Sequence, residues 1–241
     1  IELKPFKIEF ITLTHSILEP NGLRIETPVG NILHTGDWKV DPDPLIGENI
    51  NSKRLKQIGD EGVLAMICDS TNVFSEGKSG SEMDVRKSLV KIIERLKKRI
   101  VVTSFASNVA RMETIFYCAK KTGRQISLVG RSMHKIFKAA RKCGYLKDIV
   151  EPIDSREAKN ISRNKIIYLC TGSQGEPMGA MSRISNFSHP DVYLEKDDAV
   201  IFSSKIIPGN EKKLYKLHNQ LVKDGIEVIS EDTEFVHVSG H

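Results

Sequence analysis

Apolar and polar residues alternate over residues 7–14 (KIEFITLT), which is the period of a half-buried β-strand. Two shorter strand patterns, 23–27 and 31–34, flank the turn-forming run Pro28-Val29-Gly30, and together they predict a β-hairpin. Residues 63–68 (VLAMIC) are continuously apolar, which is typical of a buried strand. The first part of the chain is therefore predicted to consist mostly of strands.

The pattern changes to a helical period after residue 80. Ser81 and the acidic residues after it predict a helix start, and apolar residues then recur at helical spacing as far as Leu96. Ser107 is expected to be the N-cap of the next helix. The remaining predicted strands are 100–103, 126–129, 166–170, 199–202 and 226–229. The helices among them are one with apolar residues from Val109 to Ala119 and a cap at Gly123, one over 132–143, and one from about 210 to 223. Strands alternating with helices through short loops favour parallel βαβ units.

Composition narrows the class of protein only a little. The formal charge is 36 − 31 = +5, which permits a polyanionic partner without requiring one. The four cysteines, Cys68, Cys118, Cys143 and Cys170, form no CxxC pair and lie in apolar patterns, which favours a reducing compartment. No apolar run approaches the ~18 residues of a membrane span. We therefore expect a cytoplasmic protein without a membrane partner.

Polar side chains that bind metals follow several predicted strands. His15 and Asp37 each follow a strand, Asp69 follows the apolar run, and residues 237–241 read His-Val-Ser-Gly-His. A single His or Asp in such a place is usually a cap or a satisfied buried group. Converging imidazoles and carboxylates hold hydrolytic zinc, and a carboxylate can be shared by two zinc ions. His15 and Asp37 are therefore candidates for a terminal ligand and a bridging ligand.

Five motifs in order strengthen this hypothesis. They are Thr14-His15-Ser16, the run from His34 to Asp41, the run from Cys68 to Asn72, the run from Thr171 to Glu176, and the run from His237 to His241. The set closely resembles the ribonuclease J family, a bacterial and archaeal group of β-CASP nucleases with the metallo-β-lactamase fold. The resemblance covers essentially the whole chain.

The resemblance implies an α/β architecture in two domains. Residues 1–77 would be part of a metallo-β-lactamase αββα sandwich, and residues 78–236 a β-CASP domain with a mainly parallel sheet flanked by helices. Residues 237–241 would begin the return to the first domain. We expect the chain to be a fragment, because the family's His-x-His-x-Asp-His run, its last histidine and its C-terminal domain are not among these residues.

The resemblance also implies a role for each matching residue. His15 would bind one zinc, and Asp37 would bridge two zincs and take part in catalysis. Asp69 would be the acidic residue of the first β-CASP motif, and His241 the histidine of the second, which stabilises or protonates the reacting phosphate. The residues expected to bind substrate are Ser104, Asn108, Ser173, His237, Val238, Ser239, Gly240 and His241.

The function implied for the intact enzyme is zinc-dependent RNA hydrolysis. It would hold two zincs, cleave phosphodiesters with a metal-bound hydroxide, and combine 5′-to-3′ exonuclease with endonuclease action in RNA processing and decay. The RNA would carry a 5′-monophosphate, and the enzyme would form a homodimer or homotetramer. With most of the family's zinc ligands missing, we expect this fragment to be inactive alone and to bind zinc incompletely.

Other interpretations remain open. The chain could belong to a different metallo-β-lactamase-fold hydrolase, such as a DNA nuclease, or to a non-catalytic RNA-binding module. The loop after Thr171 is most simply a turn, and Trp38 and Phe105 most simply pack in or beside a core. Five basic residues, Arg131, Lys135, Lys138, Arg141 and Lys142, form either a solvated helix face or a contact with phosphates.

Overall fold

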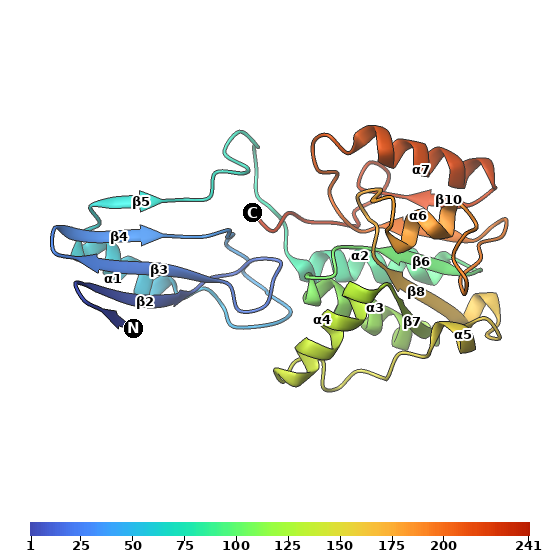
Figure 1. Cartoon of the computed structure of the whole chain (residues 1–241), viewed down its shortest axis with the longest axis horizontal. Coiled ribbons are helices and arrows are strands. Elements are labelled where there is room, and N and C mark those ends of the chain that lie inside the picture. The colour runs from blue at the N-terminus through green and yellow to red at the C-terminus, as the bar shows by residue number, and fades with distance from the viewer. The chain divides into compact units, whose positions relative to one another are not determined.

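The computed structural model describes all residues from 1 to 241. They divide into two compact units: residues 1–83 together with 239–241, and residues 84–238 (Figure 1). Each unit has its own five-stranded sheet, and each is described separately below. The domain boundaries expected after residues 77 and 236 remain a prediction.

The first unit contains one five-stranded sheet in the order β1-β2-β3-β4-β5. Neighbouring strands are antiparallel from β1 to β4, and β5 adds parallel to β4 at the edge. The predicted hairpin is confirmed, with Thr27 opposite Gly30 at its turn. Its elements are β1 (Glu2–Leu3), β2 (Phe6–Thr12), β3 (Asn21–Thr27), β4 (Gly30–His34), α1 (Ser52–Glu61) and β5 (Ala65–Ile67).

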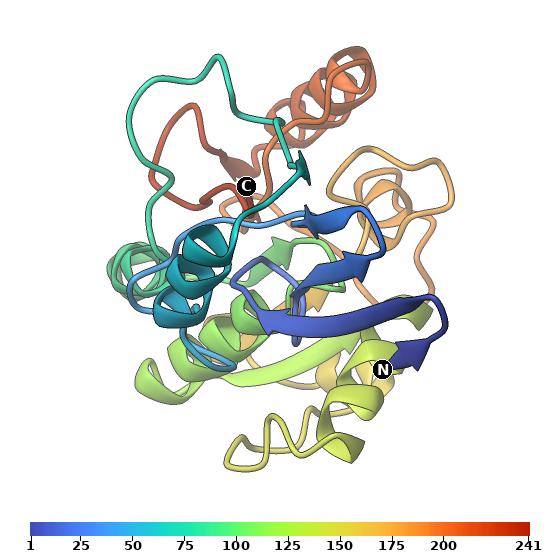
Figure 2. The same ribbon diagram turned by 90° about the vertical axis from the view of Figure 1, so that its left-hand side faces the viewer.

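One face of this sheet is covered by α1, as Figure 2 shows. The small buried cluster of this unit consists of Ile11 of β2, Leu13 just after β2, and Ile58 of α1. The alternation along β2 sends Phe6 and Phe10 to the opposite face, where their exposed fractions are 46% and 56%. The sheet therefore has one packed face and one apolar face that is largely uncovered.

The expectation that residues 63–68 form a buried strand is wrong. β5 is an edge strand, and the exposed fractions of Leu64, Met66 and Ile67 are 64%, 60% and 55%. An apolar run shows that a segment can be buried, but its burial requires partners on both sides. β5 pairs with β4 alone.

The helix α1 was not predicted, because its stripe of apolar residues is narrow. Ile58 is its one buried residue, and the side chain of Asn51 caps its start by accepting a hydrogen bond from the backbone N–H of Arg54. The guanidinium of Arg54 also binds Glu9 of β2 and Glu61. Packing and ion pairs with the sheet therefore stabilise a helix that has only two apolar residues, Leu55 and Ile58.

The second unit contains a wholly parallel sheet in the order β10-β9-β6-β8-β7, as the strand–helix alternation predicted. Every residue of its three central strands is buried, because helices cover both faces. The strands are β6 (Ile100–Thr103), β7 (Gln125–Val129), β8 (Ile166–Cys170), β9 (Ala199–Phe202) and β10 (Glu227–Ile229).

Helices pack on both faces of this sheet (Figure 1). Arg86 of α2 pairs with Glu113 of α3, so these two helices lie side by side, and Phe116 of α3 stacks on Phe137 of α4. The helices α6 and α7 cover the other face. The helices are α2 (Glu82–Arg95), α3 (Val109–Lys121), α4 (Arg131–Lys142), α5 (Ser155–Ala158), α6 (Ala180–Ser185) and α7 (Glu211–Lys223), with a 3₁₀ turn at Arg163–Lys165.

Two details of the second unit differ from the sequence prediction. The N-cap of α3 is Asn108 and not Ser107, since the Asn108 side chain accepts from the backbone N–H of Arg111 at 2.9 Å. The short helices α5 and α6 were not predicted, because so few residues show no clear period. None of the helices is both long and apolar enough to cross a membrane.

Candidate metal centre

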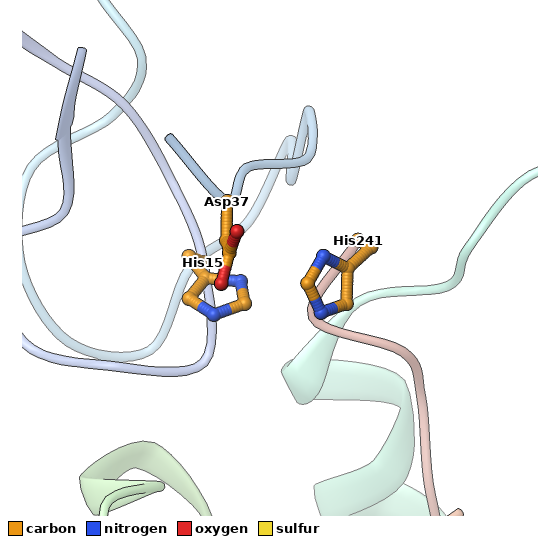
Figure 3. A group of neighbouring side chains, drawn as sticks. All are labelled: His15, Asp37 and His241. Atoms are coloured by element: carbon orange, nitrogen blue, oxygen red, sulfur yellow. The ribbon is translucent and has the colours of Figure 1, made fainter. Parts of the chain in front are cut away.

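Three side chains predicted from the sequence converge in the first unit. His15 follows β2, Asp37 follows β4, and His241 comes from the terminal segment that belongs to this unit (Figure 3). One ligand atom from each lies within 4.8 Å of the other two. The structure therefore brings His241 beside the expected ligands His15 and Asp37, and two imidazoles with one carboxylate are a donor set that suits zinc.

The ring of His15 is oriented for metal binding. Its Nδ1 lies 2.6 Å from the carbonyl oxygen of Gly240. A carbonyl can only accept, so Nδ1 carries the hydrogen and Nε2 keeps its lone pair for a metal. A Cβ added to Gly240 would lie 2.7 Å from Cε1 of His15, so a glycine is needed for this approach.

His241 is oriented in the same manner by Asp69. Its Nδ1 lies 2.6 Å from Oδ2 of Asp69. Burial of the Asp69 carboxyl opposes its ionisation, but hydrogen bonds from Thr71, His241 and Trp38 outweigh burial and hold its pKa well below the usual range. The carboxylate is therefore charged at neutral pH, and it directs Nε2 of His241 away from Asp69, where it can bind a metal when unprotonated or donate to a phosphate when protonated.

Asp37 is exposed and lies on a turn that its neighbours shape. Gly36 has a φ of +61°, a left-handed conformation that favours glycine. The backbone N–H of Gly36 donates to Nδ1 of His34 at 3.0 Å. The turn is thus held by the left-handed Gly36 and by its hydrogen bond to the His34 ring.

A buried network anchors the next residues of the same loop. The hydroxyl of Thr14 donates to the carbonyl of Lys39 and accepts from the backbone N–H of Asp41. The ammonium of Lys39 donates to the Gly80 carbonyl at 2.9 Å and lies 3.5 Å from the Asp41 carboxylate. Burial raises the pKa of Asp41, but hydrogen bonds and the Lys39 charge give a net lowering. This network joins the loops that carry His15 and Asp37.

Asn72 lies in the run from Cys68 to Asn72 and is a site residue that its sequence pattern alone did not identify. Its amide donates to Oγ of Ser239 at 3.0 Å and to the carbonyl of His241 at 2.9 Å. The Ser239 hydroxyl also accepts from the backbone N–H of His241. Asn72 therefore holds the terminal segment against the Asp69 loop, and its place three residues after Asp69 was the available signal.

A depression of about 390 Å³ lies next to these residues within the first unit. It is lined by Trp38, by residues 68–73 and by His241. The pair formed by Asp69 and His241 therefore faces open space beside the candidate ligands. A substrate phosphate could reach the imidazole of His241 from this side.

The other predicted substrate residues belong to the second unit. Ser104 and Ser173 follow β6 and β8, whose last residues are paired, so both lie at the carboxyl edge of the sheet; both are almost fully buried. Asn108 caps α3, and His237 and Val238 end the unit. Arg111 is fully buried and donates to the carbonyl of Val236, immediately before this segment. Their roles in substrate binding remain a prediction.

The fold and the converging side chains define a class of protein. A strand-rich unit with a His–Asp–His group, joined in sequence to a parallel α/β unit, is the architecture of a β-CASP protein of the metallo-β-lactamase class. A sequence model described as "Ribonuclease J, beta-CASP domain" matches residues 97–221. The chain belongs to the ribonuclease J family.

Individual relatives agree with this assignment. The chain is 41% identical to ribonuclease J of Sinorhizobium meliloti and 41% identical to ribonuclease J 1 of Streptococcus pyogenes, with 100% of the chain and 43% of each relative covered. It is 39% identical to ribonuclease J of Thermus thermophilus, with 98% of the chain and 41% of that relative covered. The chain thus spans less than half the length of these relatives.

A solved structure shows the same fold at low sequence identity. It is a protein of unknown function from Enterococcus faecalis, with a TM-score of 0.65 and 14% identity. The alignment covers 100% of this chain and 54% of that one. At this identity the likeness concerns the fold alone.

Proposed function

We propose that this chain is part of a zinc-dependent ribonuclease that hydrolyses RNA phosphodiesters in the cytoplasm. The observation that carries the proposal is the convergence of His15, Asp37 and His241, with both imidazoles oriented through Nδ1. Membership of the ribonuclease J family supports RNA as the substrate. Two zincs in the intact site, 5′-monophosphorylated RNA, combined 5′-to-3′ exonuclease and endonuclease action, and a homodimer or homotetramer are finer parts of the same proposal.

Each residue has a stated part in this proposal. His15 would be a terminal ligand of one zinc, and Asp37 would be a carboxylate ligand available to two. When bound, zinc would lower the pKa of a water molecule and so supply the nucleophile at neutral pH. Asp69 accepts from Nδ1 of His241, so the protonated imidazole would direct its Nε2–H toward the reacting phosphate. Ser239 and Gly240 present backbone N–H groups to substrate phosphate.

Residues 1–241 supply only part of such a dinuclear site, and we propose that they bind zinc weakly and cleave RNA little by themselves. The decisive experiment therefore uses the chain within a protein extended to the length of its relatives. We expect Asp37→Ala to remove nearly all RNA hydrolysis and to lower the zinc content measured by atomic emission. Asp60→Ala, an exposed change on α1, serves as the control. Hydrolysis at an unchanged rate in the Asp37 variant would show that the bridging assignment is wrong.

The alternative functions give different results in the same protein. Cleavage of single-stranded DNA at the rate of RNA would indicate a DNA nuclease or a nuclease without sugar preference. RNA binding with neither zinc at stoichiometric level nor cleavage would indicate a non-catalytic module. The oriented imidazoles of His15 and His241 favour the metal-dependent enzyme, because a binding module has no need of free Nε2 atoms.

A further inference from the structure

The outward face of α4 is the most strongly basic helix surface in the sequence. The helix contains five Lys and Arg residues and no Asp or Glu, so its formal charge is 5 − 0 = +5. The whole chain also has a formal charge of +5, so the other residues are neutral in sum. The positive charge of this protein is therefore concentrated, in net terms, on one helix.

Four of these cations lie in one line. Arg131, Lys135, Lys138 and Lys142 are spaced i, i+4, i+7 and i+11, which places them on one face of a helix. All four are exposed. Because each residue rises 1.5 Å, the line is about 16 Å long. We call these four residues the α4 stripe.

The opposite face of α4 provides its packing. Met133, Phe137 and Ala140 are buried, and Phe137 stacks on Phe116 of α3. The fifth cation, Arg141, pairs with Glu151 and lies beside Phe137. The α4 stripe is therefore not needed to hold the helix on the sheet.

No member of the α4 stripe forms an ion pair, as is also true of Lys212 and Lys216 on α7, but α4 differs from α7 in containing no Asp or Glu. On α2, the exposed Lys87 pairs with Asp84. Like charges four residues apart destabilise a helix, and a cation in the first turn is opposed by the helix dipole. A stripe that keeps both unfavourable features is better explained by an anionic ligand than by solvation.

We propose that the α4 stripe binds the phosphate backbone of single-stranded RNA, as a contact additional to the candidate metal centre. The inference rests on the proposed function for its choice of polyanion. A line of cations about 16 Å long suits a regularly charged polymer better than a single phosphate. Arg131, at the sheet edge where Ser104 and Ser173 lie, can also bind a phosphate through two parallel hydrogen bonds.

The test is a triple charge reversal, Lys135→Glu, Lys138→Glu and Lys142→Glu, in the 241-residue chain. Binding to a 3′-labelled 20-nucleotide RNA is measured by fluorescence anisotropy between 0.05 and 0.3 M salt. Each phosphate contact contributes about 0.7 to the slope of log affinity against log salt. Loss of three contacts lowers that slope by about 2 and weakens binding about 100-fold at 0.1 M salt.

The matched control is the triple reversal Lys212→Glu, Lys216→Glu and Lys223→Glu on α7. These lysines are also exposed, also lie on one helix face in the second unit, and change the net charge equally. Circular dichroism establishes that both variants keep the helical content of the parent. An unchanged slope in the α4 variant, or an equal loss in both variants, overturns the proposal.

A second ligand separates RNA from an acidic protein partner. If the α4 reversal abolishes binding of poly-glutamate while RNA binding is unchanged, the surface recognises acidic protein and the proposal is wrong. The result of this binding test is also independent of the role proposed for Asp37 in RNA hydrolysis. RNA hydrolysis in the extended protein depends on Asp37, whereas the salt slope of the chain depends on the α4 stripe, so either can fail without the other.

Discussion

The residues around the candidate metal centre show how a neighbouring acceptor group selects which nitrogen of an imidazole carries a hydrogen. The imidazoles of His15 and His241 each use Nδ1 for a fixed partner, a carbonyl in one case and a carboxylate in the other. Both partners accept, so both rings must keep a hydrogen on Nδ1 and direct Nε2 outward. In each ring, one acceptor 2.6 Å from Nδ1 thus decides that this nitrogen carries a hydrogen.

This arrangement predicts the effect of Asp69→Asn. The amide keeps the size of the side chain, but it lacks the charge and can also donate, so His241 loses its preference for one tautomer. In the protein extended to the length of its relatives, we expect kcat for RNA to fall about 100- to 1,000-fold. In the chain itself, nitrogen-15 NMR of His241 would show a mixture of tautomers. Asp60→Asn is the control, and an unaltered His241 spectrum in the Asp69 variant would contradict the prediction.

At the scale of elements, α1 and the strand β2 are joined by charge as well as by packing. Arg54 of α1 binds both carboxylate oxygens of Glu9, and this hydrogen bonding lowers the pKa of Glu9 more than burial raises it. Arg24 of β3 pairs with Glu61 near the end of α1. The helix α1, which has few apolar residues, is therefore held on its sheet by ion pairs as well as by packing.

The lowered pKa of Glu9 gives a pH dependence of defined sign. The folded state binds fewer protons than the unfolded state below the ordinary pKa of 4.5, so stability falls as the pH drops through the lowered pKa. Arg54→Met should reduce the loss of stability on acidification. At pH 7 the substitution should lower the free energy of unfolding by about 0.2–1 kcal/mol, because the pair is partly exposed. The midpoints of urea unfolding at pH 7 and pH 3.5 measure both effects.

The control for this experiment is Lys53→Met, at an exposed position of the same helix with no ion pair. It changes the net charge equally but leaves Glu9 and Arg54 in place. Equal pH dependence in the two variants would mean that the interaction between Glu9 and Arg54 does not determine acid stability.

The whole molecule combines a small core with a large one. The first unit has three buried residues in its cluster, Ile11, Leu13 and Ile58, and it leaves an apolar sheet face with Phe6 and Phe10 exposed. The second unit buries all residues of its central strands. Since each fully buried aliphatic side chain contributes about 1.5–3 kcal/mol, the second unit is expected to be the more stable.

Unfolding in urea should therefore occur in two steps. Trp38 is the one tryptophan of the chain, and it packs against the cluster of the first unit, so its fluorescence reports on that unit. Far-ultraviolet circular dichroism reports mainly on the helices of the second unit. We expect the fluorescence midpoint at a lower urea concentration than the dichroism midpoint. Coincident transitions would contradict this and would show that the chain unfolds as one cooperative body.

The sequence by itself determined the strands and most of the longer helices, because a period of two or of 3.6 residues is a local property. The parallel order of the second sheet followed from the same alternation, and the ordered motifs indicated the family. The helix α1, the exposure of β5 and the cap at Asn108 did not follow. Each of these three features depends on which residues pack or bond beside the segment, and the hydrophobic period of the segment does not reveal its neighbours.

His15, Asp37, Asp69 and His241 were selected as residues, but only the tertiary structure decided what each one faces. The residues of the Asp69–His241 pair are 172 positions apart in sequence, and those of the contact between His15 and the Gly240 carbonyl are 225 apart. Contacts between residues so far apart in sequence arise because the end of the chain returns to the first unit. The sequence therefore supplied the imidazoles and carboxylates, and the folded chain determined which nitrogen of each imidazole is free to bind a metal or a phosphate.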